Sequence, residues 1–505
     1  MCVATFMIQL DVTVVNVALP RIQAGLGMGP GGLEWVIGAY ALSLAALIPA
    51  GGALGDHYGR KRMFLAGMAV FTIGSAACAL SPNAGLLIAS RAVQGVGGAA
   101  MLALTLSIIT ETFPAEQRAA AIGSWAAIGG TGFGFGPVVG GLLLTYFSWA
   151  SVFWVNIPLA VVGIAASVLA VRESRDEASR RLDRVGLALS ASGLVAVTLG
   201  LVDSSSHRWG SRPVSVPLAV GVMLLVAFVL WERRIPHAMV PPSLLRTRSF
   251  ASATLIYLAG YTAFAGALFY VTLLYQDAIG WSVLRTGASW LFMNIPFLCL
   301  AQLAGRLDRR FSAGVVVGAG SLLAGAGMLA LSFASPGAPF LVTAVGYALS
   351  GAGFGVLVPT LTHVAMRDVA SGMSGVASGV LNAARQLGTA LGLAVLGTIG
   401  VRAAIAHWHA ATVHLAQPVR GIARRHAQDV GGARIAAVTK ALGPSYRHAA
   451  TASFVHGYHL AVASGACCLF IAAVVAAVGF GRTPEAATVG MTTSQEMACQ
   501  ANSTS

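Results

Sequence analysis

The stretch Gly51-Gly-Ala-Leu-Gly-Asp-His-Tyr-Gly-Arg-Lys-Arg62 lies between two apolar runs, near residues 33–54 and 63–80. Each run is close to the roughly 20 residues that a helix needs to cross a bilayer. Three basic residues at the end of a short connection are typical of a cytoplasmic loop between two spans. A similar loop, Gly305-Arg-Leu-Asp-Arg-Arg310, follows a later apolar run. The two loops predict a membrane protein built from two parallel halves.

The composition agrees with an all-α integral membrane protein. The chain has 505 residues, of which 56% are hydrophobic and 10% are charged, whereas a soluble domain carries about 25% charged residues. Its 61 glycines suit helices that pack closely within a bilayer. Apolar windows predict fourteen spans, near 2–20, 33–54, 63–80, 85–109, 119–144, 150–171, 185–202, 214–231, 251–275, 286–304, 313–334, 338–360, 375–400 and 451–480.

The basic residues predict the orientation of these spans. Most Arg and Lys residues fall in alternate loops, so we expect both termini in the cytoplasm and the chain in the plasma membrane. The basic segment 401–450 falls outside, but long segments translocate with less regard to charge. Because the chain opens inside a span, we expect the natural start to lie upstream.

These spans divide the chain into four parts. We predict an N-terminal six-helix half (1–171), two inserted helices with flanking loops (172–249), a C-terminal six-helix half (250–480) with a long extracellular loop at 401–450, and a disordered cytoplasmic tail (481–505).

Several classes of function are disfavoured. The net charge of +14 lies in short loops with no basic groove, so we expect no nucleic-acid partner. The six cysteines are scattered and the histidines dispersed, so we expect no metal site, no catalytic residues and no enzyme. No P-loop is present, which disfavours ATP as the energy source, and no ring of repeated residues suggests a channel.

Five further segments carry a set of ordered motifs. They are Leu10-Asp11-Val-Thr-Val-Val-Asn16-Val-Ala-Leu-Pro20, Arg91-Ala-Val-Gln94-Gly95-Val-Gly97-Gly98, Gly132-Phe-Gly-Phe-Gly136-Pro137-Val-Val-Gly140-Gly141, Asn156-Ile-Pro158 and Arg385-Gln386-Leu-Gly388. Together with the loop 52–62, they resemble the major facilitator superfamily, specifically its fourteen-span drug:proton antiporter branch of the multidrug efflux type. One departure is Ala150, where that branch often has Arg after Trp149.

Two charges lie deep inside the predicted spans. A carboxylate at Asp11, near the middle of the first span, is costly unless it is paired, hydrated or protonated. Asp11 is therefore a candidate for proton coupling or for binding a cationic substrate; the alternative is a structural hydrogen bond to Thr13, Asn16 or a neighbouring helix. Arg91 in the fourth span needs a partner, and we expect Asp11 or a water in that place. The alternative for Arg91 is snorkelling toward an interface.

The loop residues Gly52, Asp56, Gly59, Arg60 and Arg62 are predicted to form a conformational latch. Gly55 and Gly59 permit a tight turn, and Asp56 is expected at the start of the third span, where the helix dipole favours an anion. The resemblance implies that this network holds one of two access states.

In the fifth span, we expect Gly132, Gly136, Gly140 and Gly141 on one face for close packing. Pro137 is expected to bend that helix, and the resemblance adds a role in sealing an exchanger against proton leak.

The candidate substrate contacts are aromatic: Tyr257, Tyr261, Phe264, Trp290 and Phe292. Aromatic walls suit lipophilic cations, although such residues are more often packing residues. His363, His456 and His459 are treated as polar packing residues, with proton relay as the alternative.

The sequence thus predicts a proton-coupled antiporter that exports lipophilic small molecules by alternating access and confers antibiotic resistance. Its expected partners are small lipophilic or monocationic substrates, protons and membrane lipids; compact dications fit poorly, and we expect a monomer. No cofactor is expected beyond the proton gradient. The alternatives are a dedicated exporter of a self-made antibiotic or metabolite, an uncoupled facilitator and an intramembrane enzyme.

Overall fold

The computed structural model describes residues 1–27, 30–174, 183–204, 210–235, 244, 246–367, 369 and 373–480, and these residues form helices and no strand. The predicted tail, 481–505, lies outside the described residues.

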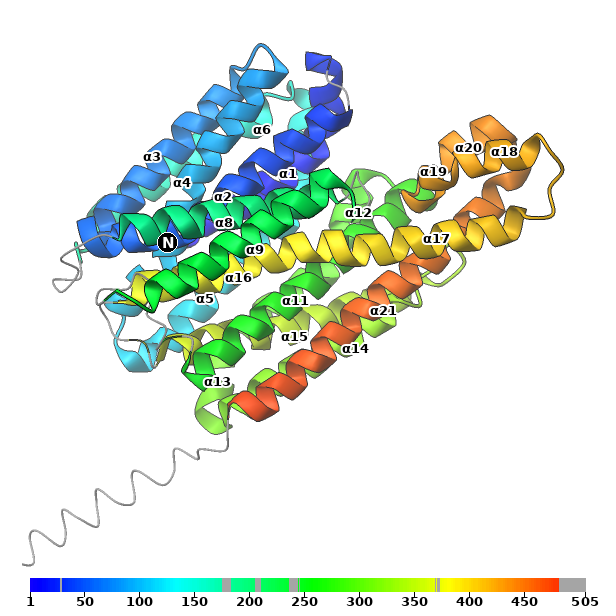
Figure 1. The fold of residues 1–505 in the computed structure, drawn as a ribbon. Helices are drawn as coiled ribbons and strands as arrows, with labels where there is room; N and C mark the ends of the chain where they lie inside the picture. The colour runs from blue at the N-terminus through cyan, green and yellow to red at the C-terminus, as the bar shows by residue number, and fades with distance from the viewer. Residues whose placement is uncertain are drawn as a thin grey trace, which may run out of the picture.

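The helices fall into two bundles with a pair between them in sequence (Figure 1). The first bundle contains α1 (Cys2–Leu26), α2 (Pro30–Tyr58), α3 (Arg60–Ala79), α4 (Ala84–Thr112), α5 (Ala115–Tyr146), α6 (Ser151–Trp154) and α7 (Asn156–Ala170). The pair is α8 (Arg184–Asp203) and α9 (Arg212–Glu232). The second bundle contains α11 (Arg248–Leu273), η1 (Leu274–Ala278), α12 (Val283–Ser289), α13 (Leu291–Arg310), α14 (Ala313–Leu331), α15 (Phe340–Arg367), α16 (Ser374–Leu391), η3 (Gly392–Leu396), α17 (Gly397–Thr412) and α21 (Arg447–Gly479).

The number of full spans is close to the predicted fourteen. In the described residues, twelve helices are long and apolar enough to cross a membrane, and α5 adds a thirteenth as one bent span. The apolar part of α8, Val185–Leu201, is shorter. The all-α membrane architecture is confirmed, and a helix or a helix pair lies at each predicted span.

The same packing pairs recur in both bundles. In the first, α3 and α2 pack on α4, and α1 packs on α5; in the second, α14 and α13 pack on α15, and α11 packs on α16. Gly97 in α4 meets the backbone of α3, and Gly353 in α15 meets the backbone of α14, so neither position has room for a Cβ. The pair α8 and α9 lies outside this scheme, with α8 against α2 and α9 against α8.

The segment 401–450, which the sequence predicts as a long loop, is mostly helical. Helix α17 and the first turns of α21 extend beyond the bundle, and α18 (Val419–Arg425), α19 (Ala427–Gly431) and α20 (Ile435–Leu442) cap them. Figure 1 shows this helical projection as the orange end of the molecule. Buried Trp408, Val430 and Val438 supply its small core. Helix α19 ends at Gly431, and Gly432 lies in the turn before α20, as the low helix propensity of glycine favours.

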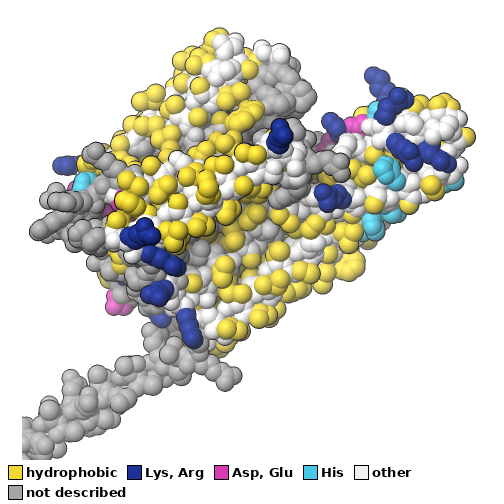
Figure 2. All heavy atoms as spheres, viewed as in Figure 1, with side chains coloured by type: hydrophobic (Ala, Val, Ile, Leu, Met, Phe, Trp, Pro, Cys, Tyr) yellow, Lys and Arg dark blue, Asp and Glu magenta, His cyan; other side chains and the backbone are white. Residues whose placement is uncertain are grey.

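The surface agrees with a bilayer environment. Hydrophobic side chains cover the middle of the face seen in Figure 2, and Lys and Arg gather mainly toward its two ends. On α9, Val216, Val220, Met223 and Val226 are all exposed. Because soluble proteins rarely expose such a contiguous apolar face, this surface fits lipid contact.

Candidate functional site

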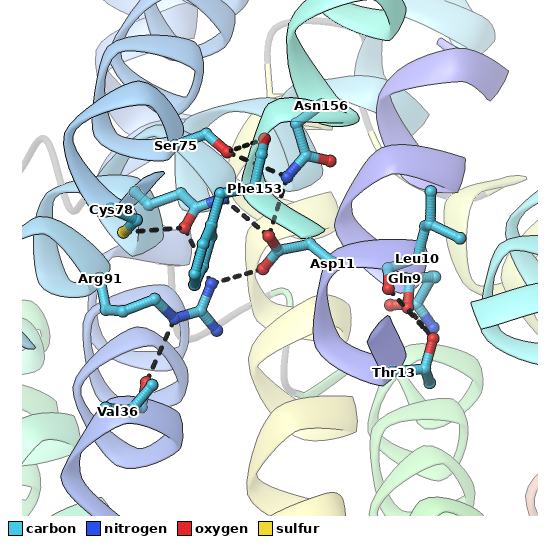
Figure 3. A network of polar contacts seen from close by, with 11 residues as sticks. Gln9, Leu10, Asp11, Thr13, Val36, Ser75, Cys78, Arg91, Phe153 and Asn156 are labelled. Carbon is cyan, nitrogen blue, oxygen red and sulfur yellow. Dashed lines mark hydrogen bonds and ion pairs between the residues drawn. The ribbon is translucent and has the colours of Figure 1, made fainter. Parts of the chain in front are cut away.

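A fully buried ion pair joins α1 to α4 (Figure 3). Asp11 has none of its surface exposed and Arg91 has 1%. The Nη1 of Arg91 donates to Oδ2 of Asp11 over 2.5 Å. The expectation that Asp11 is the partner of Arg91 is thereby confirmed. Thr13, the alternative partner of Asp11, donates to the carbonyls of Gln9 and Leu10.

Two amide side chains complete the surroundings of the carboxylate. Oδ1 of Asp11 accepts hydrogen bonds from Gln94 Nε2 in α4 and from Asn156 Nδ2 at the start of α7, each over 2.9 Å. Asn156 also donates to Ser75 Oγ in α3 over 3.0 Å. The carboxylate therefore joins α1 to α4 and α7, and Asn156 extends the cluster to α3.

The guanidinium of Arg91 has further partners of its own. Its Nε donates to the carbonyl of Val36 over 3.1 Å, and its Nη1 donates to Gln94 Oε1 over 2.8 Å. Its Cζ lies 4.1 Å from the centre of the Tyr40 ring, a cation–π contact. Tyr40 Oη and Asn156 Oδ1 have no hydrogen-bond partner in the part of the chain that the structure describes.

The charges of Asp11 and Arg91 balance each other. Protonation of the Asp11 carboxylate would remove its charge and so end this balance. A buried carboxylate with three donors is well compensated, whereas breaking a buried pair is costly. Nothing in the sequence marks Ser75 and Tyr40 as site residues, and Gln94 and Asn156 stand out there only as motif residues. The one available signal was the i, i+3 spacing of Arg91 and Gln94, which places both on one helix face. Asn16 is exposed and has no hydrogen bond to the pair.

The predicted latch lies where α2, α3, α4 and α16 come together. Arg60 is buried, and it contacts Asp56 Oδ1 over 2.8 Å and Glu111 Oε1 over 3.0 Å. Oδ2 of Asp56 accepts from the backbone N–H of Val376, in the first turn of α16, over 3.2 Å. This bond connects the two bundles, since α2 belongs to the first and α16 to the second.

The expected place of Asp56 at the start of the third span is wrong. The carboxylate there belongs to Glu173, which accepts from the backbone N–H groups of Lys61 and Arg62 over 3.0 and 3.2 Å. Asp56 instead places its charge at the start of α16, where the helix dipole also favours an anion. The exposed side chain of Arg62 lies 3.6 Å from Glu173.

The glycines of this region differ in role. Gly59 has φ of 109°, which fits the predicted tight turn. Gly55 lies inside α2, and a Cβ there would meet Leu104, so it permits close helix packing and takes no part in the turn. Gly52 is buried within α2.

The equivalent loop of the second bundle has a different partner. Asp308 Oδ2 lies 2.6 Å from Nδ1 of His363, near the end of α15. His363 thus contacts a carboxylate in its own bundle. The other two histidines take part in packing: His456 stacks on His407 at 4.9 Å, and His459 hydrogen-bonds a backbone carbonyl.

The glycine motif of α5 packs against α1. A Cβ at Gly132 would meet Phe6, and a Cβ at Gly136 would meet Thr13. A Cβ at Gly140 would lie only 3.3 Å from Val17, whereas a Cβ at Gly141 would meet nothing within 4 Å. The expectation that all four glycines share one packed face is therefore wrong for Gly141. The predicted bend at Pro137 is present, since α5 turns by 42° between Gly136 and Val138.

A third buried arginine, after Arg91 and Arg60, lies in α16, and no carboxylate among the described residues contacts it. Arg385 has 8% of its surface exposed. Its hydrogen bonds go to neutral oxygens: Asn382 Oδ1 at 3.3 Å, Tyr257 Oη at 2.8 Å and Thr362 Oγ1 at 3.4 Å. We call these residues, with Trp125 and Tyr261, the Arg385 cluster. Gln386, the next residue of the motif, is half-buried.

Aromatic rings surround this guanidinium. The Cζ of Arg385 lies 4.5 Å from the ring centre of Tyr257, 5.0 Å from that of Trp125 and 5.8 Å from that of Tyr261. Phe264 lies beside Tyr261, with ring centres 6.1 Å apart. Three predicted substrate contacts, Tyr257, Tyr261 and Phe264, thus form one wall.

The other two predicted contacts lie elsewhere. Phe292 is half exposed and contacts Phe340, with ring centres 5.5 Å apart. Trp290 is buried at the break between α12 and α13. Neither is among the ring contacts of the Arg385 cluster.

Comparison with known proteins gives consistent matches. Residues 1–393 match the family model described as Major Facilitator Superfamily. The chain is 35% identical over 424 residues to the multidrug resistance protein Stp of Mycobacterium tuberculosis, covering 83% of this chain and 78% of that protein. It is 36% identical over 396 residues to the methylenomycin A resistance protein of Streptomyces coelicolor, covering 78% of this chain and 83% of that protein. Among solved structures, the human organic anion transporter MFSD10 has a TM-score of 0.61 at 15% identity, covering 94% of this chain and 98% of that one. At such low identity this likeness shows the fold alone.

Proposed function

The chain belongs to the major facilitator superfamily, and from this premise we propose that it exports drug-like small molecules across the plasma membrane in exchange for protons. The relatives support export, since two of them are named for multidrug and antibiotic resistance. The observation that carries proton coupling is the buried pair of Asp11 and Arg91.

We infer the following use of that pair. A proton from the outer water neutralises the Asp11 carboxylate and breaks its ion pair with Arg91. The guanidinium then keeps the Val36 carbonyl, Gln94 Oε1 and the Tyr40 ring as partners. When the proton leaves to the cytoplasm, the pair forms again. Because the pair joins α1 to α4, its two states favour different packings of the first bundle.

The bond from Val376 to Asp56 fits the other half of such a cycle. It links α2 to α16 at the end of the molecule that the basic loop 51–62 marks, which we expect to be cytoplasmic. Movement of the bundles apart at this end would break the bond, so the latch would open when the carrier faces the cytoplasm.

The test is probe uptake into everted membrane vesicles with an imposed inside-acid gradient. We would use two dyes that share a xanthene ring system, anionic fluorescein and cationic rhodamine 123. Wild-type vesicles are expected to accumulate at least one dye only while the gradient lasts. The variant Asp11→Asn should lose this dependence, and so should the double variant Asp11→Asn/Arg91→Gln, which removes both charges of the buried pair.

The matched control is Asp429→Asn, which removes a carboxylate from the helical projection, where it contacts His426 and Arg434. Uptake that persists in wild type after the gradient is collapsed would contradict proton coupling. Gradient-driven uptake that survives in the double variant would place the coupling site away from Asp11.

A narrower exporter is a second candidate, because one relative is named for resistance to a single antibiotic, methylenomycin A. An antibiotic susceptibility panel in an efflux-deficient host separates the two. Protection against several unrelated compounds supports the broad exporter, and protection against one compound supports the dedicated one.

A further inference from the structure

We propose that Arg385 binds an anionic group of the exported molecule, so that the substrates join a flat apolar ring system to a negative charge. This inference rests on the proposed export function and names its substrate class. It starts from the Arg385 cluster, which the proton-coupling mechanism does not use.

No residue that the structure describes supplies a countercharge to Arg385. An arginine side chain stays protonated in proteins, and a buried charge is expensive unless it is paired. In the described structure, all hydrogen-bond partners of Arg385 are neutral oxygens, from Asn382, Tyr257 and Thr362. Arg91, by contrast, has Asp11 at 2.5 Å. The guanidinium of Arg91 is thus compensated inside the protein, whereas no described residue supplies an anion to that of Arg385.

The guanidinium of Arg385 also has more N–H groups than hydrogen bonds to described residues. It carries five N–H groups, and three hydrogen bonds leave from its two terminal nitrogens. Its Nε is buried and has no partner in the described residues. A carboxylate binds a guanidinium through two parallel hydrogen bonds, so an anion would fill donors that the protein leaves open.

The position suits a transported ligand. Trp125 belongs to α5 of the first bundle, whereas Arg385 belongs to α16 of the second. Nearby, Nδ2 of Asn382 donates to the carbonyl of Leu102 in α4 over 3.2 Å. The cluster therefore lies between the two bundles, where carriers with repeated halves bind their substrates.

The rings around Arg385 define the rest of the ligand. Trp125 is held by its Nε1, which donates to Thr5 Oγ1 over 2.7 Å. Tyr261 and Phe264 are only partly buried, so each can offer part of its ring to a ligand. A flat apolar body would stack on this wall while its anion reaches Arg385.

The charge preference predicted from the sequence is thereby reversed. Aromatic rings attract cations when their faces are free, but the rings of Tyr257, Tyr261 and Trp125 already carry the guanidinium of Arg385. A second cation there would meet a like charge. Monocationic substrates are therefore disfavoured at this wall, and anionic amphiphiles are favoured.

The experiment measures binding of the two xanthene dyes to the purified full-length protein in detergent, by fluorescence anisotropy. Wild-type protein should bind fluorescein at least ten-fold more tightly than rhodamine 123. Arg385→Gln should weaken fluorescein binding at least ten-fold without weakening rhodamine 123. Arg385→Lys, which keeps the charge but loses the planar fork, should recover part of the affinity. The control Arg402→Gln changes net charge equally at an exposed site on α17 and should bind fluorescein as wild type does.

The outcomes separate this inference from the export function. Tighter wild-type binding of rhodamine 123 than of fluorescein would overturn the inference without any variant, even if both dyes are transported. Equal loss of fluorescein binding in Arg385→Gln and Arg402→Gln would also overturn it. Fluorescein binding that depends on Arg385, with no gradient-driven uptake in vesicles, would support the inference and count against proton-coupled export.

Discussion

The two bundles each bury an arginine among aromatic rings, yet they treat its charge in opposite ways. In the first bundle, Arg91 meets the carboxylate of Asp11, the side-chain amide of Gln94 and the carbonyl of Val36. In the second, the hydrogen bonds of Arg385 to described residues go only to hydroxyl and amide oxygens. In the proposed mechanism, protonation of Asp11 changes the first arrangement, and an anionic group of the substrate completes the second. Two bundles of the same architecture can thus take different tasks, with proton coupling in the first and substrate binding in the second.

The largest effect is expected from breaking the complete pair. Asp11→Asn leaves Arg91 buried without a countercharge, and breaking a buried pair costs about 3–5 kcal/mol. Thermal unfolding in detergent should show a clear loss of stability. The double variant Asp11→Asn/Arg91→Gln should regain most of that stability, because Arg91 no longer carries a buried charge without its partner. If Asp11→Asn were as stable as wild type, Arg91 would not need its countercharge, and it would not differ from Arg385 in this respect.

The next largest effect is expected when Arg385 is given an internal carboxylate, as Arg91 has in Asp11. Thr362→Asp places a carboxylate beside Arg385, whose Nη2 lies 3.4 Å from Thr362 Oγ1. Fluorescein binding should fall at least ten-fold, since the guanidinium gains an internal partner, and the protein should become no less stable. Thr362→Asn, of nearly the same shape without the charge, is the control. Equal weakening by both variants would mean that shape, and not charge, is responsible.

The bond between the bundles should have a smaller, kinetic effect. Asp56→Asn weakens the contact with Val376 N–H and the pair with Arg60, and an anion at a helix start contributes about 0.3–1 kcal/mol. We expect dye uptake to slow several-fold while dye affinity in detergent is unchanged. Glu173→Gln, which removes an anion only from the start of α3, should slow uptake less. The reverse order would assign the latch to α3 and not to the contact between bundles.

The smallest effect is expected in the second loop. Asp308 contacts His363 in its own bundle, so Asp308→Asn should change uptake by less than Asp56→Asn does. Parallel uptake rates for the two variants in the same vesicles make the comparison. An equal slowing would show that both loops control the cycle, although only one of them bonds across the bundles.

The sequence was sufficient for the fold and for one ion pair. Long apolar runs and basic loops follow directly from the bilayer, and a charge inside a span needs a partner, so Asp11 could be assigned to Arg91. Neutral polar residues in a span need no charged partner. Ser75 and Tyr40 therefore could not be predicted as site residues from the sequence.

Other features depend on tertiary contacts that a sequence does not contain. Asp56 is near the start of α3 in sequence, but the docking of α16 gives it another helix start. Arg385 belonged to a quoted motif, yet its missing countercharge appears only when its neighbours are known. The face of Gly141 and the helices within 401–450 are likewise settled by packing.

The helical projection has a practical consequence. It continues α17 and α21, both of the second bundle, so any rotation of that bundle against the first moves its tip as the end of a lever arm. The chain contains two lysines, Lys61 at the start of α3 and Lys440 in α20 near this tip. A label on each of these lysines would mark one bundle each, and the distance between the two labels would test whether the bundles rotate against each other.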